Sequence, residues 1–212
     1  MRFFYDWEFL EDGKTIEPIS VGIVCENGNQ YYAVNGEMPV MKIGKHDWLC
    51  KNVVPHLPIE TGTSDVISEY FRKGLYFTGS DPLEIDLDYR DQLVKPIYQI
   101  AYEVQDFFHE NTATELDGGS SRKYEGIELW ANYPAYDHVR LMQLWGPMMG
   151  RPSFMPMQTD DLQTLWKAKG RPRGLPQQDP ETEHHALFDA LHDQELFNFL
   201  VELPYSNWPK GN

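Results

Sequence analysis

The architecture follows from one stretch near the start of the sequence, Arg2-Phe3-Phe4-Tyr5-Asp6-Trp7-Glu8-Phe9-Leu10, which is aromatic and apolar on both faces of an extended chain. Such a segment is typical of a strand that is buried on both sides, not of an edge strand. Because side chains alternate along a strand, Asp6 and Glu8 should point to the same face, roughly 7 Å apart, and Trp7 to the opposite face.

The pair Asp6 and Glu8 is the sharpest anomaly of the sequence, because two carboxylates share one small volume of a buried strand. Burying an unpaired carboxylate costs several kcal/mol, and Arg2 is the one basic residue nearby in sequence. Divalent cations are a natural compensation for this charge. The alternative is that the strand ends near the surface and that both carboxylates are solvated.

Hydrophobic periodicity and turn residues predict three strands, a helix, a strand, a helix, a strand and a final helix. The first half has strands over 2–10, 16–25 and 30–34, with a hairpin turn at 26–29, a short helix over 46–54 and a turn-rich segment over 59–92. The second half has a helix over 93–110, a loop over 117–121, a strand over 125–131, a helix from Pro134 to about 148, a strand over 154–157, a helix over 160–169 capped by Thr159, and a helix over 184–202. This order predicts an α/β fold, a mixed sheet flanked by helices.

Length and composition indicate an ordinary globular chain. We expect one domain over residues 1–212, with 55–124 containing an insertion after the first helix. No apolar run is long enough to span a membrane, and the first residues do not resemble a secretory signal. Cys25 and Cys50 have neither metal-site nor disulfide spacing, which favours buried thiols and a cytoplasmic location. The net charge of −15 excludes nucleic-acid binding by bulk electrostatics, so any such contact is local or metal-mediated.

Three further positions are candidates for chemistry. Asp137 falls in the first turn of the helix after the 125–131 strand, where it is either a third metal ligand or a carboxylate that favours the helix dipole. His184 and Asp189 are five residues apart, so on one helix they would lie on different faces. His184 should therefore lie on the loop or the first turn that enters the last helix, where an imidazole suits a general base. The alternative for His184 is an exposed residue near a helix start.

One basic cluster stands out in this acidic chain: Lys167, Lys169, Arg171 and Arg173. It is a candidate for binding phosphates beside the reacting end of a nucleic acid. Cations at the end of a helix are also favourable without any ligand, so a solvated charged run is the alternative.

Taken together, three segments in this order resemble the motifs of the DEDDh 3′-5′ exonuclease superfamily: Asp6-Trp7-Glu8, Asn132-Tyr133-Pro134-Ala135-Tyr136-Asp137, and His184-His185-Ala186-Leu187-Phe188-Asp189-Ala190. Further stretches, among them Gln143-Leu144-Trp145-Gly146-Pro147-Met148, resemble the RNase AS exoribonucleases, which prefer adenylate tails. The resemblance covers about two thirds of the chain and matches 55–124 poorly. The sequence departs from that family at Trp7, where Thr is usual.

The resemblance implies an RNase H-like fold and a site in which Asp6, Glu8, Asp137 and Asp189 bind two Mg²⁺ or Mn²⁺ ions, with His184 as the general base. It implies hydrolysis of single-stranded RNA from its 3′ end, release of nucleoside 5′-monophosphates, and a homodimer. Contacts to substrate are expected from Trp7, Asn132, Lys169 and Arg171. Two alternatives stay open at this point. One is a single-stranded DNA 3′-5′ exonuclease. The other is a non-catalytic module that binds a basic partner through its acidic surface.

Overall fold

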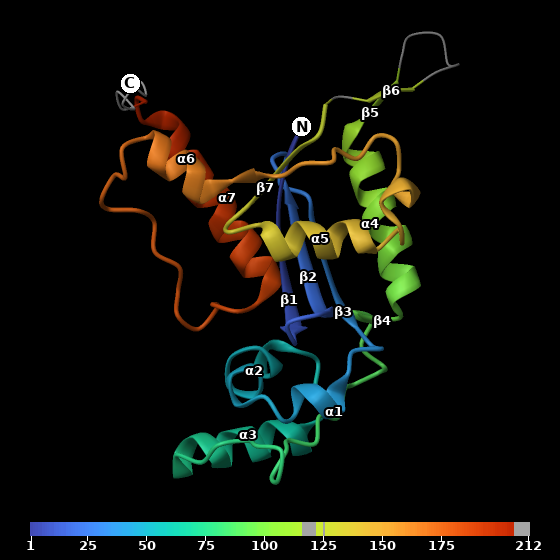
Figure 1. Cartoon of the computed structure of the whole chain (residues 1–212), viewed down its shortest axis with the longest axis vertical. Coiled ribbons are helices and arrows are strands. Elements are labelled where there is room, and N and C mark those ends of the chain that lie inside the picture. Colours follow the sequence, from blue (N-terminus) through green and yellow to red (C-terminus); the bar gives the residue numbers. More distant parts are fainter. Residues whose placement is uncertain (116–121, 125, 206–212) are drawn as a thin grey trace.

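Six strands form one mixed sheet in the order β4-β3-β2-β1-β7-β8 in the computed structural model, which describes residues 1–115, 122–124 and 126–205 (Figure 1). The strands of this sheet are β1 (Arg2–Glu11), β2 (Ile16–Cys25), β3 (Gln30–Asn35), β4 (Val94–Lys95), β7 (Glu128–Ala131) and β8 (Asp160–Asp161). The strands β5 (Ala113–Glu115) and β6 (Arg122–Tyr124) form a separate antiparallel pair. The strand β1 pairs antiparallel with β2 and parallel with β7, so the first strand is central, as its apolar faces predict.

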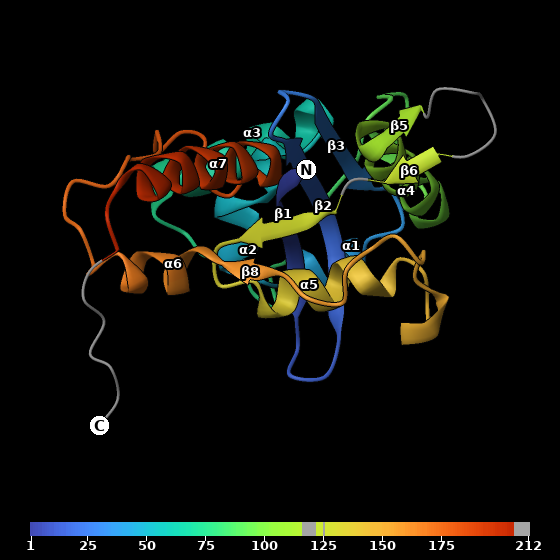
Figure 2. The ribbon, with the colours of Figure 1, turned by 90° about the horizontal axis from the view of Figure 1, so that it is seen from above.

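Helices cover both faces of this sheet, which confirms the mixed α/β fold. The helices of the described residues are α1 (Val40–Ile43), α2 (Asp47–Asn52), α3 (Thr61–Lys73), α4 (Ile97–Thr112), α5 (Ala135–Gln143), α6 (Leu162–Ala168) and α7 (Ala186–Glu202), with short 3-10 helices η1 (Val54–His56) and η2 (Met148–Gly150). Viewed from above, β1 and β2 lie between α7 on one side and α5 on the other (Figure 2). None of the described helices combines the length and the apolar character that a membrane crossing requires.

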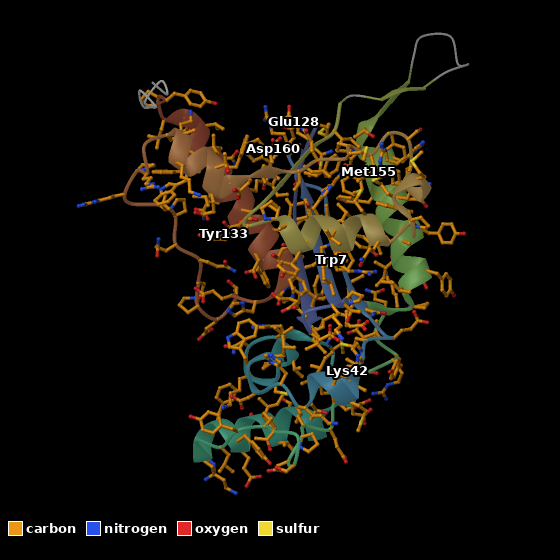
Figure 3. The ribbon with its side chains drawn as sticks, in the orientation of Figure 1. Trp7, Lys42, Glu128, Tyr133, Met155 and Asp160 are labelled. Atoms are coloured by element: carbon orange, nitrogen blue, oxygen red, sulfur yellow. The ribbon has the colours of Figure 1, made fainter. Side chains whose placement is uncertain are left out.

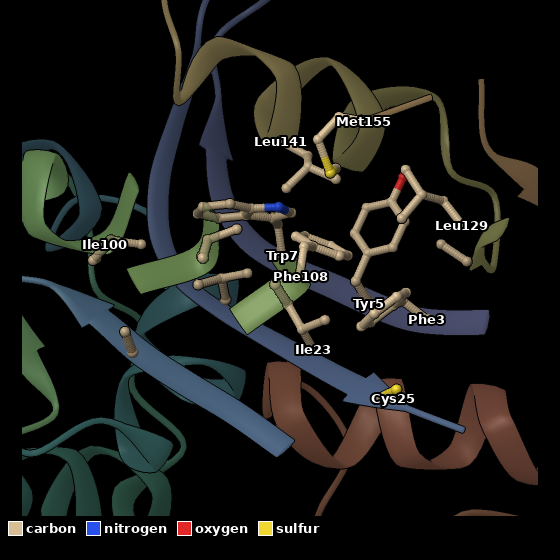
Figure 4. Packing of buried hydrophobic residues seen from close by; sticks show 14 residues of the cluster. Phe3, Tyr5, Trp7, Ile23, Cys25, Ile100, Phe108, Leu129, Leu141 and Met155 are labelled. Carbon is tan, nitrogen blue, oxygen red and sulfur yellow. The ribbon is translucent and has the colours of Figure 1, made fainter. Parts of the chain in front are cut away.

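The two faces of β1 have different partners. Phe3, Tyr5 and Trp7 point into a core with residues of α4 and α5, where Figure 4 shows the Trp7 and Tyr5 rings together with Leu141 and Met155. Phe4 points the other way and packs with residues of α6 and α7. Asp6 and Glu8 follow Phe4 at period two, so they belong to the face that α7 covers.

The helix α7 lies directly on β2 at Gly22. A Cβ atom placed on Gly22 would lie 2.3 Å from the backbone of Ala186 and Leu187 at the start of the helix. Gly22 pairs with Asp6 across the β1-β2 ladder. The missing side chain of Gly22 therefore brings the start of α7 next to the first carboxylate.

A second apolar cluster lies at the end of the sheet, where residues of α1, α2, η1 and α3 pack with the segment that follows them. The sequence predicted only turn-rich chain over 59–92, whereas the structure has the 13-residue helix α3. The reason is that α3 buries only Thr63 and Ile67, so its apolar pattern is short. That 55–124 contains an insertion stays a prediction.

Several element boundaries differ from the predictions. The helix α5 ends at Gln143, before a turn in which Gly146 has φ +75°, and does not reach 148. The strand expected over 154–157 is wrong, and the strand in this part of the chain is β8, Asp160–Asp161. The expected cap Thr159 is also wrong, because Asp161 caps α6 by accepting hydrogen bonds from the amides of Gln163 and Thr164. The last helix begins at Ala186 because the His185 ring accepts a hydrogen bond from the Leu187 amide and caps it. The loop expected over 117–121 lies outside the described residues.

Both cysteines are free and buried, as the sequence predicts. Burial raises the pKa of the Cys25 thiol, and it raises the pKa of the Cys50 thiol to about 12. Neither thiol lies among the residues that line the cavities described below.

Candidate active site

The three acidic motifs meet in one place. Two adjoining cavities of about 370 and 410 Å³ share Asp6, Asn132, His184 and Asp189 among their lining residues, and the first is also lined by Glu8 and Asp137. Parallel pairing explains the meeting of the first two motifs. Because Phe4 lies opposite Trp130, Asp6 is level with Asn132, at the carboxyl end of β7 where the chain enters α5.

Asp137 is fixed against β1 by a hydrogen bond that the Trp7 amide donates to its Oδ1 atom at 3.0 Å. The carboxylate is buried, and this burial raises its pKa to about 6. Asp137 stands in the first turn of α5, as the sequence predicts, and points toward the first motif. The helix start is therefore tied to the strand that carries Asp6 and Glu8.

Asp189 and His184 come from the two sides of the start of α7. The His184 amide donates a hydrogen bond to Asp189 Oδ2 at 3.1 Å, and Gln178 Nε2 donates to Asp189 Oδ1 at 2.5 Å. His184 precedes the helix and has φ +66°, in the left-handed region. The structure thus has His184 on the entering segment and Asp189 on the helix, as the sequence predicts.

The carboxylates crowd one another without a compensating Lys or Arg in the described lining of the cavities. Burial raises the pKa of both Asp6 and Glu8 well above the ordinary range, and neighbouring carboxylates raise them further. Among the described residues that line the two cavities there is no Lys or Arg. A cluster of anions in this setting needs cations or protons.

The geometry of the cluster fits a metal ion. One ligand atom from each of Glu8, His184 and Asp189 lies within 4.8 Å of the others. Asp6 and Asp137 line the same cavity, and carboxylate oxygens are the donors that Mg²⁺ and Mn²⁺ prefer. The donor set therefore suits hard divalent cations.

Sequence reasoning missed a fifth acid, Asp193. This residue is 4% exposed, lines the second cavity, and accepts a hydrogen bond from the Asn132 amide at 3.0 Å. Burial raises its pKa well above the ordinary value. The signal was present, because Asp193 follows Asp189 by four residues on one helix face. Gln178 and Trp48, which also line the site, gave no signal in the sequence.

Asn132 and Trp7, two of the residues expected to contact substrate, both line the first cavity, but they differ in how far their side chains are buried. Asn132 lines both cavities, and its side-chain oxygen accepts a hydrogen bond from Gln163 Nε2 at 2.8 Å. The Trp7 ring is only 2% exposed and packs in the core on the opposite face of β1. Trp7 thus lines the first cavity while its ring lies in the core, and its contact with substrate stays a prediction. Tyr133, labelled in Figure 3, lines the first cavity and is 69% exposed.

Lys169 and Arg171 do not line the cavities, and their contact with substrate stays a prediction. The Lys169 ammonium donates to the Leu203 carbonyl at 2.6 Å and lies over the Tyr205 ring, and the Arg171 guanidinium lies over the Trp166 ring. The helix α6, which precedes Lys169, lies beside the C-terminal part of α7 (Figure 1). The carboxylates of the site gather at the N-terminal end of α7, where Asp189 stands. Lys169 thus contacts the segment that follows α7, and Arg171 packs on a ring of α6.

Fold and site define an α/β protein whose central strand presents acidic side chains to a helix start, an arrangement compatible with an RNase H-like fold. The sequence profile described as "3′-5′ exoribonuclease Rv2179c-like domain" matches residues 86–201. Two proteins of Mycobacterium tuberculosis, "3′-5′ exoribonuclease Rv2179c" of strain H37Rv and "3′-5′ exoribonuclease MT2234.1" of strain CDC 1551, are each 36% identical over 201 residues, which is 95% of this chain and 94% of theirs. The chain belongs to the Rv2179c-like family.

Proposed function

We propose that this protein is a metal-dependent 3′-5′ exoribonuclease that releases nucleoside 5′-monophosphates from single-stranded RNA. The observation that carries the proposal is the meeting of Asp6, Glu8, Asp137 and Asp189 at one cavity whose lining, among the described residues, contains no Lys or Arg. The names of the two similar mycobacterial proteins support the reaction, its direction and RNA as the substrate.

In this proposal the four carboxylates hold two Mg²⁺ or Mn²⁺ ions. Bound there, the ions would neutralise the scissile phosphate and stabilise the charge that develops during an in-line displacement. The raised pKa values of Asp6 and Glu8 are those of the metal-free cluster, in which like charges face one another. Cations would remove this cost and would present positive charge to RNA, despite the net charge of −15.

His184 acts as the general base. Its imidazole accepts a proton from the attacking water, and the water oxygen bonds to the terminal phosphorus. The bond from phosphorus to the 3′ oxygen of the preceding nucleotide breaks, and this oxygen takes up a proton from solvent water to become the new 3′-hydroxyl. The products are a nucleoside 5′-monophosphate and an RNA shortened by one residue. The hydrogen bond from the His184 amide to Asp189 ties the base to a carboxylate of the site.

A matched set of variants tests the function. The wild-type protein with Mg²⁺ and a 5′-labelled RNA should produce a ladder that shortens from the 3′ end, and EDTA should abolish it. Asp6→Asn should be inactive, whereas Asp65→Asn, at an exposed carboxylate on α3, should keep full activity. No mononucleotide from the wild-type protein would reject the proposal.

The same assay decides between the remaining alternatives. A DNA oligonucleotide of the same sequence in competition tests the DNA exonuclease, since only contacts to the 2′-hydroxyl separate the two polymers. Unchanged biological activity of Asp6→Asn would support the non-catalytic module instead. Homopolymer RNAs test the adenylate preference, and light scattering tests the homodimer. Cell fractionation tests the cytoplasmic location.

A further inference from the structure

His184 is contacted by a segment that lies far away in the sequence. In α2, Trp48 places the edge of its ring against the His184 imidazole, with ring centroids 4.7 Å apart and planes at 70°. In η1, His56 lies 5.9 Å from the His185 ring and hydrogen-bonds to the backbone of Glu183. The segment 47–56 thus touches three successive residues around the proposed base, and it lies outside the 86–201 range that the family profile matches.

His185 anchors the same stretch to the sheet. Its ring stacks on Tyr32 of β3 at 4.4 Å and 27°, and it meets the edge of Phe188 at 4.7 Å. One of its ring nitrogens caps α7 through the Leu187 amide. His185 therefore faces away from the site and fixes the backbone on the C-terminal side of His184.

The backbone of His184 needs such support. Its φ of +66° lies in the left-handed region, which residues with a side chain adopt only where the surroundings hold them. On one side of His184, His56 holds Glu183, and on the other side Ala186 rests directly on Gly22. What remains free is the rotation of the imidazole, and the Trp48 ring lies against it.

We propose that Trp48 and His56 are positioning residues for His184. Trp48 limits the orientations of the imidazole, and His56 holds the backbone that carries it, so that the ring faces Glu8 and Asp189. The catalytic consequence rests on the proposed function. The orientation of the His184 imidazole does not depend on the proposed function, and it is measurable in the metal-free protein.

Nuclear magnetic resonance of histidine-labelled, metal-free protein tests the structural part. In Trp48→Leu the His184 ring signals should shift and broaden, because the ring current and the contact of the indole are lost, and Trp48→Phe should restore part of the effect. In His56→Ala the amide signals of residues 183–185 should shift, and His56→Gln, which keeps a donor for the Glu183 backbone, should restore them in part. Tyr102→Leu, at an exposed ring on α4, is the matched control and should leave His184 unchanged.

Kinetics on RNA test the catalytic part. Since a small misplacement of a catalytic group is costly, Trp48→Leu should lower kcat on the order of tenfold with a smaller change in KM. Unmoved His184 signals together with a raised KM and an unchanged kcat would overturn the proposal, since Trp48 would then contact substrate. If the wild-type protein cleaves no RNA but the His184 signals move as expected, the proposed function fails and the positioning of His184 stands.

Discussion

The two faces of β1 show how one strand serves two opposed purposes. On the face toward α4 and α5, Phe3, Tyr5 and Trp7 are buried with apolar partners, and this burial stabilises the fold. On the face toward α7, Asp6 and Glu8 are surrounded by other carboxylates, and their burial is unfavourable until a cation or a proton arrives. Because side chains alternate along β1, the packing of Phe3, Tyr5 and Trp7 on one face fixes the positions of Asp6 and Glu8 on the other.

The sharpest test of the acidic face is Asp6→Asn. Activity should fall by at least about 100-fold, because even the outer partners of metal ligands are worth 10–100-fold. Without metal, the same variant should be more stable than the wild type, since one of the mutually repelling charges is gone. Thermal unfolding in EDTA and initial rates with Mg²⁺ measure the two effects. A variant that loses both stability and activity would contradict this reading of the acidic face.

The apolar face should respond in the opposite way. Trp7→Ala removes a buried ring, and large-to-small changes of this kind cost about 3–5 kcal/mol of stability. Denaturant unfolding should show this loss both in EDTA and with Mg²⁺. If the stability of Trp7→Ala instead depended on the metal as that of Asp6→Asn does, the division between the two faces would be wrong.

A smaller effect is expected where α7 meets β2. Gly22→Ala places a methyl group against the backbone of Ala186 and Leu187, and such overpacking costs about 1–3 kcal/mol. Because the helix start carries His184 and Asp189, kcat should fall as well. Gly62→Ala is the matched control, since nothing lies near its Cβ position and alanine suits the helix α3. Equal effects of both changes would argue against the close contact.

A gradual effect is expected in the pH dependence of the stability of the metal-free protein. The folded-state pKa of Asp137, about 6, lies above its ordinary value of 3.8. Its contribution to stability is therefore fully present below pH 3.8 and is lost as the pH rises through about 6. The loss is at most about 1.4 kcal/mol per pH unit in this window. Unfolding of the wild type and of Asp137→Asn in EDTA, compared from pH 4 to about 7, measures it. The two curves should converge on the acidic side, and parallel curves would contradict the raised pKa.

Local patterns of the sequence were enough for the features that depend on one strand or one turn. Alternation predicted that Trp7 points away from Asp6 and Glu8, and the turn chemistry of 26–29 predicted the hairpin at Gly28 that joins β2 to β3. The order of the motifs, through the resemblance, predicted that Asp137, His184 and Asp189 join them. Each of these inferences rests on residues whose type is unusual for its position.

Features that depend on tertiary contacts could not be predicted. Lys169 and Arg171 follow the helix α6, and the direction of α6 depends on how it packs against α7. Trp48 contacts His184 although the two residues are 136 positions apart in the sequence. The strand β8 consists of two aspartates, which have no strand propensity, and it forms because β7 offers a free edge. Asp193 was missed although its spacing from Asp189 pointed to the same face.

The two buried thiols also have a practical consequence. Because Cys25 and Cys50 are buried and burial raises both of their pKa values, maleimide reagents at neutral pH should leave the native protein almost unlabelled. A cysteine introduced at an exposed position such as Tyr102 would then be the reactive one. A fluorophore could be attached there without first removing the natural cysteines. The binding of RNA could then be followed by fluorescence on a protein that carries a single substitution.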